Sequence, residues 1–123
     1  MGLGFQVADV RKPLAAVKRI TEKGNHVAFG PGDQDNYILN KSTGDKILLK
    51  PNGRGSYLME VSFENGEKTF VTVDSGAEEN VCPLNWGSQY PVRTDVPRMS
   101  FTNASGGDIP HYGRRDVVLC SPF

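Results

Sequence analysis

The sequence predicts a mainly β domain with one α-helix. Its 14 glycines and 8 prolines fall mostly between short runs rich in Val, Ile, Phe and Tyr, a distribution typical of turn-rich β proteins. Asn65-Gly66 is a strong signal for a two-residue turn between two such runs. A chain of 123 residues can bury one core but is too short for two independent lobes. We therefore expect a single domain covering residues 1–123.

The strands are expected where apolar residues alternate with polar ones. Residues 5–10 show this alternation and form the first expected strand. Residues 30–36 have the composition of an exposed loop. Further strands are expected at residues 27–29, 37–39, 46–49, 56–63 and 68–73.

One segment, residues 13–23, has the pattern of a helix. Pro13 suits a first helical turn, and Leu14, Val17 and Ile20 form one apolar stripe, with the charged residues, Arg19 among them, facing water. Gly24 stands where a helix would stop.

Charge and hydropathy limit the classes of partner. Lys plus Arg number 14 and Asp plus Glu number 14, so no net field favours nucleic acid or an anionic membrane surface. The apolar runs are far shorter than a bilayer span, and residues 1–5 lack a signal-peptide pattern. We expect an intracellular protein that is not secreted and binds neither nucleic acid nor membranes.

The cysteines and histidines do not predict a metal site. Cys82 and Cys120 are in no CxxC pair, and His26 and His111 lack a third ligand at zinc spacing. Reduced thiols are the first expectation, and a disulfide between the two cysteines stays open. No Gly-Lys-Ser/Thr phosphate loop is present, and we expect no cofactor.

A carboxylate stands where the strand at residues 68–73 is expected to end. Asp74 follows this strand and precedes the small residues Ser75, Gly76 and Ala77, a composition that can present the acid to a cleft. Hydrolysis of a peptide without metal or covalent nucleophile needs one ionised carboxylate to activate water and one protonated carboxyl to polarise the carbonyl. Two aspartates a few ångström apart achieve this by sharing one proton. An ordinary Asp-Ser-Gly turn is the alternative.

Residues Asp74 to Ala77 resemble the Asp-Thr/Ser-Gly-Ala active-site loop of the retropepsin family, the homodimeric aspartic proteases of retroviruses and retrotransposons. The resemblance implies a small closed β-barrel with one helix and a flap hairpin. By this resemblance Asp74 is catalytic, Ser75 bonds across the dimer axis, Gly76 lets the substrate backbone approach, and Ala77 lines the cleft.

The same resemblance extends to both sides of this loop. Glu78 and Glu79 stand where many members have acids that bind the substrate main chain. Residues 99–113 resemble the glycine-tipped flap, in which the small residues 104–107, including Ser105, Gly106 and Gly107, bend over an extended peptide and Ile109 touches its side chains. An ordinary hairpin turn fits this composition too. Residues 117–119 supply the return strand.

The order of these segments is rotated relative to the family, which indicates a circular permutation, natural or engineered. Residues 1–29 resemble the family's C-terminal part, and residues 56–123 carry the active-site loop and flap. Residues 30–55 are an extra hairpin region that serves as an interface or covers a sheet edge. The family's apolar-apolar-Gly element before the helix has no glycine counterpart in residues 7–10. Arg11 either pairs with Glu78 or is simply solvated.

The leading functional interpretation is an aspartic endopeptidase that cleaves extended polypeptide between two copies of the chain, as in the processing of a retroelement polyprotein. One alternative is a catalytically silent retropepsin fold used for dimerisation or peptide binding. Another is an unrelated β-barrel binding module in which Asp74 caps a turn. Trp86 and Tyr90 are read as packing residues, with a substrate wall as the alternative.

Overall fold

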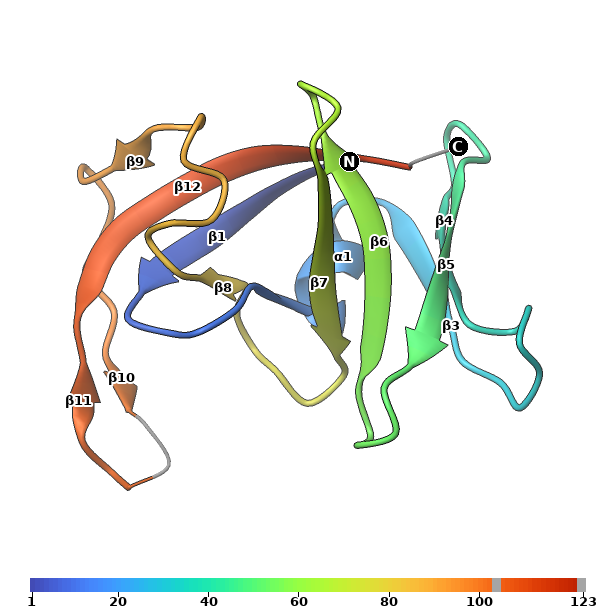
Figure 1. The fold of residues 1–123 in the computed structure, drawn as a ribbon, viewed down its shortest axis with the longest axis horizontal. Helices are drawn as coiled ribbons and strands as arrows, with labels where there is room; N and C mark the ends of the chain where they lie inside the picture. The colour runs from blue at the N-terminus through green and yellow to red at the C-terminus, as the bar shows by residue number, and fades with distance from the viewer. Residues whose placement is uncertain (103–104, 122–123) are drawn as a thin grey trace.

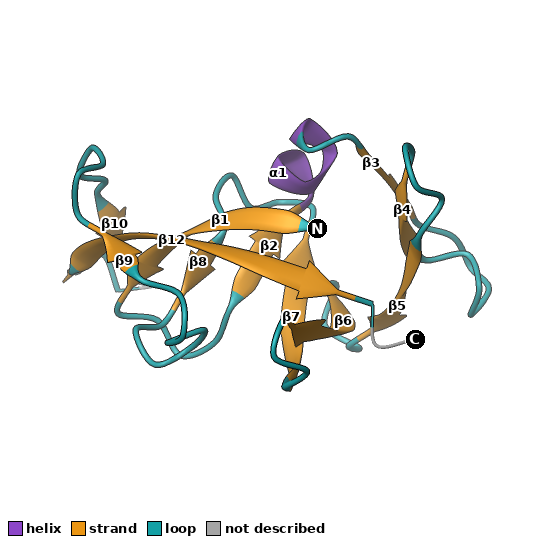
Figure 2. Ribbon diagram, turned by 90° about the horizontal axis from the view of Figure 1, so that it is seen from above, coloured by secondary structure: helices purple, strands orange, loops and turns teal. Residues whose placement is uncertain are grey.

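The alternating segments pair into a closed β-barrel in the computed structural model, which describes residues 1–102 and 105–121 (Figures 1 and 2). Six strands close the barrel in the order β6-β7-β2-β8-β1-β12, and β12 returns to pair with β6. Their bounds are β1 Gly2–Ala8, β2 Leu14–Ala16, β6 Tyr57–Phe63, β7 Lys68–Asp74, β8 Val81–Cys82 and β12 His111–Cys120.

The remaining strands extend or decorate this barrel. Strands β5, β4 and β3 continue the sheet outward from β6, and β9 pairs with β12. Strands β10 and β11 form a separate antiparallel hairpin at the end of the molecule opposite β4 and β5 (Figures 1 and 2). Their bounds are β3 Asn25–Ala28, β4 Tyr37–Asn40, β5 Lys46–Pro51, β9 Val92–Arg93, β10 Phe101–Thr102 and β11 Asp108–Ile109.

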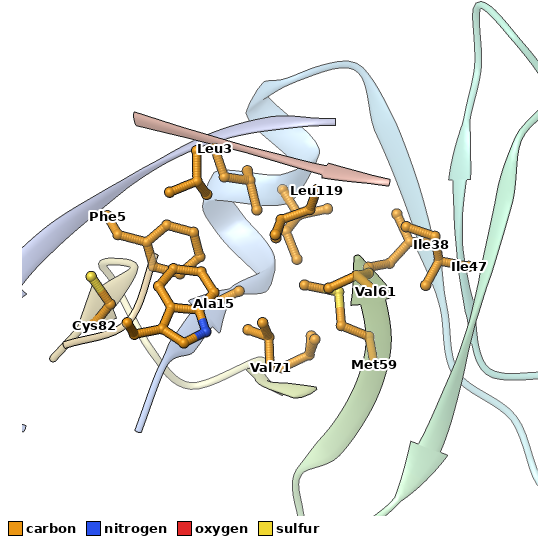
Figure 3. Close-up of a cluster of buried hydrophobic side chains, with 14 of the residues drawn as sticks. Leu3, Phe5, Ala15, Ile38, Ile47, Met59, Val61, Val71, Cys82 and Leu119 are labelled. Carbon is orange, nitrogen blue, oxygen red and sulfur yellow. The ribbon is translucent and has the colours of Figure 1, made fainter. Parts of the chain in front are cut away.

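The core fills the barrel and reaches under the β3-β4-β5 extension. On β6 the side chains of Met59, Val61 and Phe63 are buried and alternate with less buried neighbours, because successive side chains of a strand point to opposite faces. Figure 3 shows this cluster, in which Ile38 and Ile47 from the extension lie beside Met59 and Val61. The expectation of a mainly β domain with a small barrel is confirmed.

The helix α1 is shorter than predicted and spans Val17–Glu22. Leu14–Ala16 is instead strand β2, parallel to β7, with Ala15 opposite Val73 and Ala16 opposite Asp74. The prediction of helix from residue 13 is therefore wrong. The backbone groups of this segment pair with a strand distant in sequence, and this pairing outweighs the local stripe of apolar residues.

Other boundaries differ from the predicted ones. Strand β1 ends at Ala8, where its register against β12 shifts at a bulge, so residues 9 and 10, which were expected in this strand, lie outside it. The return strand expected at residues 117–119 is part of the ten-residue strand β12. The hairpin region at residues 30–55 contributes β4, which pairs with one edge of β3, and β5, which pairs with β6.

Gly113 lies opposite Val7 beside the bulge and has φ of 144°. A Cβ at this position would overlap the backbone carbonyl oxygen of Arg93 on β9. Gly113→Ala should therefore lower the free energy of unfolding by about 2–4 kcal/mol, from backbone strain together with overpacking.

Gly44 is the matched control, because its φ is also positive, at 78°, but a Cβ there would meet no atom within 4 Å. Gly44→Ala should lower the free energy of unfolding only by the cost of placing an alanine at positive φ, about 1–2 kcal/mol. Urea unfolding of both variants measures the difference, and equal losses would show that the contact with β9 is unimportant.

Among the described residues, none of the helical segments is long and apolar enough to cross a membrane.

Candidate active site at the end of strand β7

Asp74 is the last residue of β7, and its half-buried side chain lies at the start of an exposed turn. One carboxylate oxygen, Oδ1, accepts a hydrogen bond from the Gly76 N–H at 2.8 Å. Ser75 and Gly76 are exposed, and Ala77 is half-buried. The four residues predicted to form the active-site loop thus form one continuous turn that displays the carboxylate at the barrel end.

Strand β2 supports this turn from the side. Ala15 and Ala16 are fully buried, and Ala16 is the residue opposite Asp74 in the parallel ladder. Small side chains at these positions let β2 pack closely against β7 before the chain enters the helix. The segment directly before the helix is therefore Leu14–Ala16, whereas residues 7 and 8 belong to β1.

Asn80 holds the far end of the turn. Its side chain is buried; Oδ1 accepts a hydrogen bond from the Ala16 N–H at 2.7 Å, and Nδ2 donates to the Gly4 carbonyl at 3.0 Å. The Asn80 carbonyl accepts a hydrogen bond from the Gln6 N–H at 2.8 Å. One residue thus connects the turn to β1 and to β2.

Arg19 on α1 holds the acidic part of the turn. Its Nε donates to the Glu78 carbonyl at 3.1 Å, and its other nitrogens bond the carboxylates of Glu79 and Glu22. The hydrogen bond with Glu79, followed by that with Glu22, raises the pKa of the Arg19 guanidinium. Arg19 was predicted to face water; its side chain is 34% exposed, and the prediction did not include its ion pairs with Glu79 and Glu22. Arg11 is exposed and makes no ion pair within the described part of the chain.

The hairpin predicted as a flap is present as the pair β10–β11, with Phe101 opposite Ile109. Ser105, Gly106 and Gly107 are exposed at its tip, and Ile109 is half-buried. Ala104, the first of the small residues predicted at the tip, lies outside the described residues. In both views the hairpin lies at one end of the molecule while β7 lies near its middle (Figures 1 and 2). The single chain therefore does not bring the hairpin tip onto Asp74.

His111 fixes the base of this hairpin. Its Nδ1 accepts a hydrogen bond from the Met99 N–H at 3.1 Å, so the ring proton is on Nε2, which lies 2.8 Å from Oε1 of Gln6. A polar cavity of about 300 Å³ lies between this base and the turn, lined by Met99, Gln6, Arg19, Glu79 and Asn80 among others. The turn and the hairpin base thus share one polar space.

Trp86 and Tyr90 are packing residues, as the sequence indicated. The Trp86 ring lies 4.9 Å from that of Phe5 and 5.1 Å from that of Phe63, and its Nε1 donates to Thr69 Oγ1 at 2.8 Å. The buried Arg115 guanidinium donates to the carbonyls of Tyr90, Leu84 and Trp86. The segment between the turn and β9 is thereby fixed against the barrel.

Both cysteines are free thiols; Cys82 is buried and Cys120 is half-buried. Burial raises the pKa of Cys82 from 9.0 to about 11, and the nearby Arg115 only partly opposes this effect. The folded chain therefore keeps a proton that the unfolded chain releases between about pH 9 and pH 11. Stability should fall as pH rises through this interval, by about 1.4 kcal/mol per pH unit.

The contribution of Cys82 can be isolated by comparing urea unfolding of the wild type and Cys82→Ala on both sides of pH 9. The variant should be less stable at neutral pH because of the cavity, but it should lose less stability as pH rises. Equal pH slopes for the two proteins would contradict the raised pKa of Cys82.

Within residues 1–102 and 105–121, no group of three or more His, Cys, Asp or Glu side chains could hold a metal ion. Comparison of the chain with protein-family models, curated proteins and solved structures found no match.

Proposed function

We propose that the chain is one half of a retropepsin-like aspartic endopeptidase in which Asp74 supplies the catalytic carboxylate. The main support is that a turn of this geometry forms equally well with an asparagine, so the fold does not require a carboxylate at position 74. The chain makes the same i to i+2 side-chain turn at Asn40, Asn52 and Asn65, whose Oδ1 atoms accept N–H bonds of 2.8–3.0 Å. At Asp74 a carboxylate takes the place of the amide, and it stands at the open end of a barrel strand.

The chemistry requires two such carboxylates, and each copy of the chain supplies one. Close to each other, they share one proton because both cannot ionise together. The ionised Asp74 takes a proton from water as the water oxygen attacks the peptide carbonyl carbon, and the protonated Asp74 of the second copy gives its proton to the carbonyl oxygen. The tetrahedral intermediate then breaks its C–N bond as the first Asp74 gives its proton to the nitrogen and the second Asp74 takes a proton from a hydroxyl of the intermediate, which restores the pair that shares one proton.

The substrate of this proposed enzyme is an extended polypeptide. Gly76 lets its backbone pass close to the carboxylates, Glu78 and Glu79 lie beside its main chain, and the hairpin closes over it as a flap, with Ile109 against its side chains. By the family resemblance, the natural setting is the processing of a retroelement polyprotein inside a cell or particle.

The test is cleavage of an unfolded protein by the purified chain at mildly acidic pH. A statine-type peptide, which imitates the tetrahedral intermediate, should inhibit it, and the active species should sediment as a dimer. A stable monomer that neither cleaves nor binds the inhibitor would reject the proposal.

One observation favours a second candidate, a silent fold that binds peptides. The outer face of β5, β6 and β7 carries a groove of about 610 Å³ in which Leu48, Leu58 and Phe70 lie together, and Phe70 is 60% exposed. Exposed apolar patches of this kind are typical of binding surfaces. Peptide binding at this face without any hydrolysis would support the second candidate over the first.

A further inference from the structure

Asn80 differs from the other turn residues because its side-chain amide and its backbone carbonyl bond to strands of the barrel. Its side chain is 2% exposed, accepts the Ala16 N–H and donates to the Gly4 carbonyl, while its own carbonyl accepts the Gln6 N–H. Both side-chain partners are backbone groups far away in sequence. Only an amide of this length offers an acceptor and a donor on one carbon to bridge them.

The bridge acts on Asp74 through Ala16. Ala16 is the residue opposite Asp74 in the β2–β7 ladder, so the hydrogen bond from Asn80 fixes the strand that lies beside the carboxylate. The turn that begins at Asp74 also ends at Asn80. The carboxylate is therefore held from two directions, by its neighbouring strand and by the closure of its own turn.

We propose that Asn80 is a positioning residue, which sets the place of Asp74 by tying β1 and β2 to the end of the turn. This inference rests on the proposed function, since the positioned group is its catalytic carboxylate. Displacement of a reacting group by about 1 Å can cost on the order of 10²-fold in rate, so loss of the bridge should lower kcat without a comparable change in KM.

The chain contains a second buried asparagine that can serve as a control, because it stabilises the fold without contacting the turn at Asp74. Asn36 is also 2% exposed. Its Oδ1 accepts the Gly30 N–H at 3.0 Å, its Nδ2 donates to the Gly32 carbonyl at 3.2 Å, and its carbonyl accepts the Leu49 N–H at 2.8 Å. The two asparagines thus make the same three kinds of bond, but Asn36 stands in the loop between β3 and β4, and its bonds join that loop and β5.

The experiment compares Asn80→Ser with Asn36→Ser in the full chain. Both variants should lose stability in urea unfolding, because each leaves buried backbone groups with fewer hydrogen bonds. At a temperature where both are folded, only Asn80→Ser should lower kcat, on the order of 10²-fold, and shift the limbs of the pH–rate profile. Serine carries no charge, so such a shift would report altered spacing of the paired carboxylates. Asn80→Gln is also uncharged but moves the amide by one methylene group, and it serves as the second variant if the serine variant does not fold.

Unchanged kcat and pH profile in a folded Asn80 variant would overturn the inference. If the wild type itself does not hydrolyse peptides, the proposed function fails. The effect of Asn80 on the position of Asp74 can then be measured from the NMR chemical shifts of the Asp74 carboxyl and the Gly76 amide. These shifts should change in the Asn80 variant and not in Asn36→Ser. Equal or absent changes would overturn the positioning role independently of activity.

Discussion

Asp74→Asn should lower the rate of peptide hydrolysis by at least two orders of magnitude while it leaves the fold intact and changes its stability little. The asparagine Oδ1 can still accept the Gly76 N–H, as Asn40 and Asn65 accept theirs in the same kind of turn. Stability should therefore stay within about 0.5 kcal/mol of the wild type. The amide can neither take a proton from water nor donate one from a hydroxyl, and loss of such proton transfer costs roughly 10²–10⁴-fold in rate.

The control is Asp33→Asn, which removes an equal charge from the exposed loop between β3 and β4 and should leave cleavage unchanged. Mixing provides a second readout, because each active dimer needs two carboxylates. An excess of Asp74→Asn chains should inhibit the wild type by forming mixed dimers. Full activity of the variant would exclude the proposed mechanism, and an active wild type that the variant does not inhibit would exclude the shared site.

The strands could be predicted because their pattern is local. The alternation in β6 places Met59, Val61 and Phe63 in the core. The turn at Asn65-Gly66 is present, but the Phe63 N–H donates to the Glu67 carbonyl and only Gly66 has a positive φ, 88°, so the connection has three residues and not the predicted two. Neither feature depends on a partner distant in sequence. The same is true of the turn from Asp74 to Ala77, whose residues are consecutive.

The start of the helix could not be predicted in this way. Leu14 and Val17 fit the spacing of a helical stripe, yet Leu14 lies in a strand between β7 and β8, opposite Thr72 on one side and Val81 on the other. A barrel with a missing strand would leave unpaired backbone groups on both neighbours. Closure of the barrel therefore determines the structure of this segment, and closure is not visible in a local window.

The residues that hold the candidate site were missed for a related reason. The bond from Ala16 to Asn80 joins positions 64 residues apart, and that from Arg19 to Glu79 joins positions 60 residues apart. Nothing in the neighbourhood of Asn80 or Arg19 indicates these partners. Arg19 does occupy the first turn after β2, and once β2 is placed beside β7, a basic residue there lies next to the acidic pair Glu78 and Glu79.

Phe5→Ala should cause the largest loss of stability among single core truncations. Phe5 is 0% exposed on β1, and its ring meets Trp86 edge-on with centroids 4.9 Å apart. Truncation of a buried phenylalanine costs about 3–5 kcal/mol, a large share of the roughly 5–15 kcal/mol that a typical domain has in total. Urea unfolding measures the loss, and Phe5→Leu gives a folded reference if the alanine variant does not fold.

Phe70→Ala is the matched control, because the same side chain is removed from a position that is 60% exposed. It should change stability by no more than about 0.5 kcal/mol, and equal losses at the two positions would contradict the burial of Phe5. Gly4 and Gln6 flank Phe5 on β1, and their backbone groups bond Asn80. The cavity at Phe5 therefore weakens the strand that anchors the turn, so Phe5→Ala should lower both activity and stability. Asp74→Asn, in contrast, should lower activity and leave stability nearly unchanged.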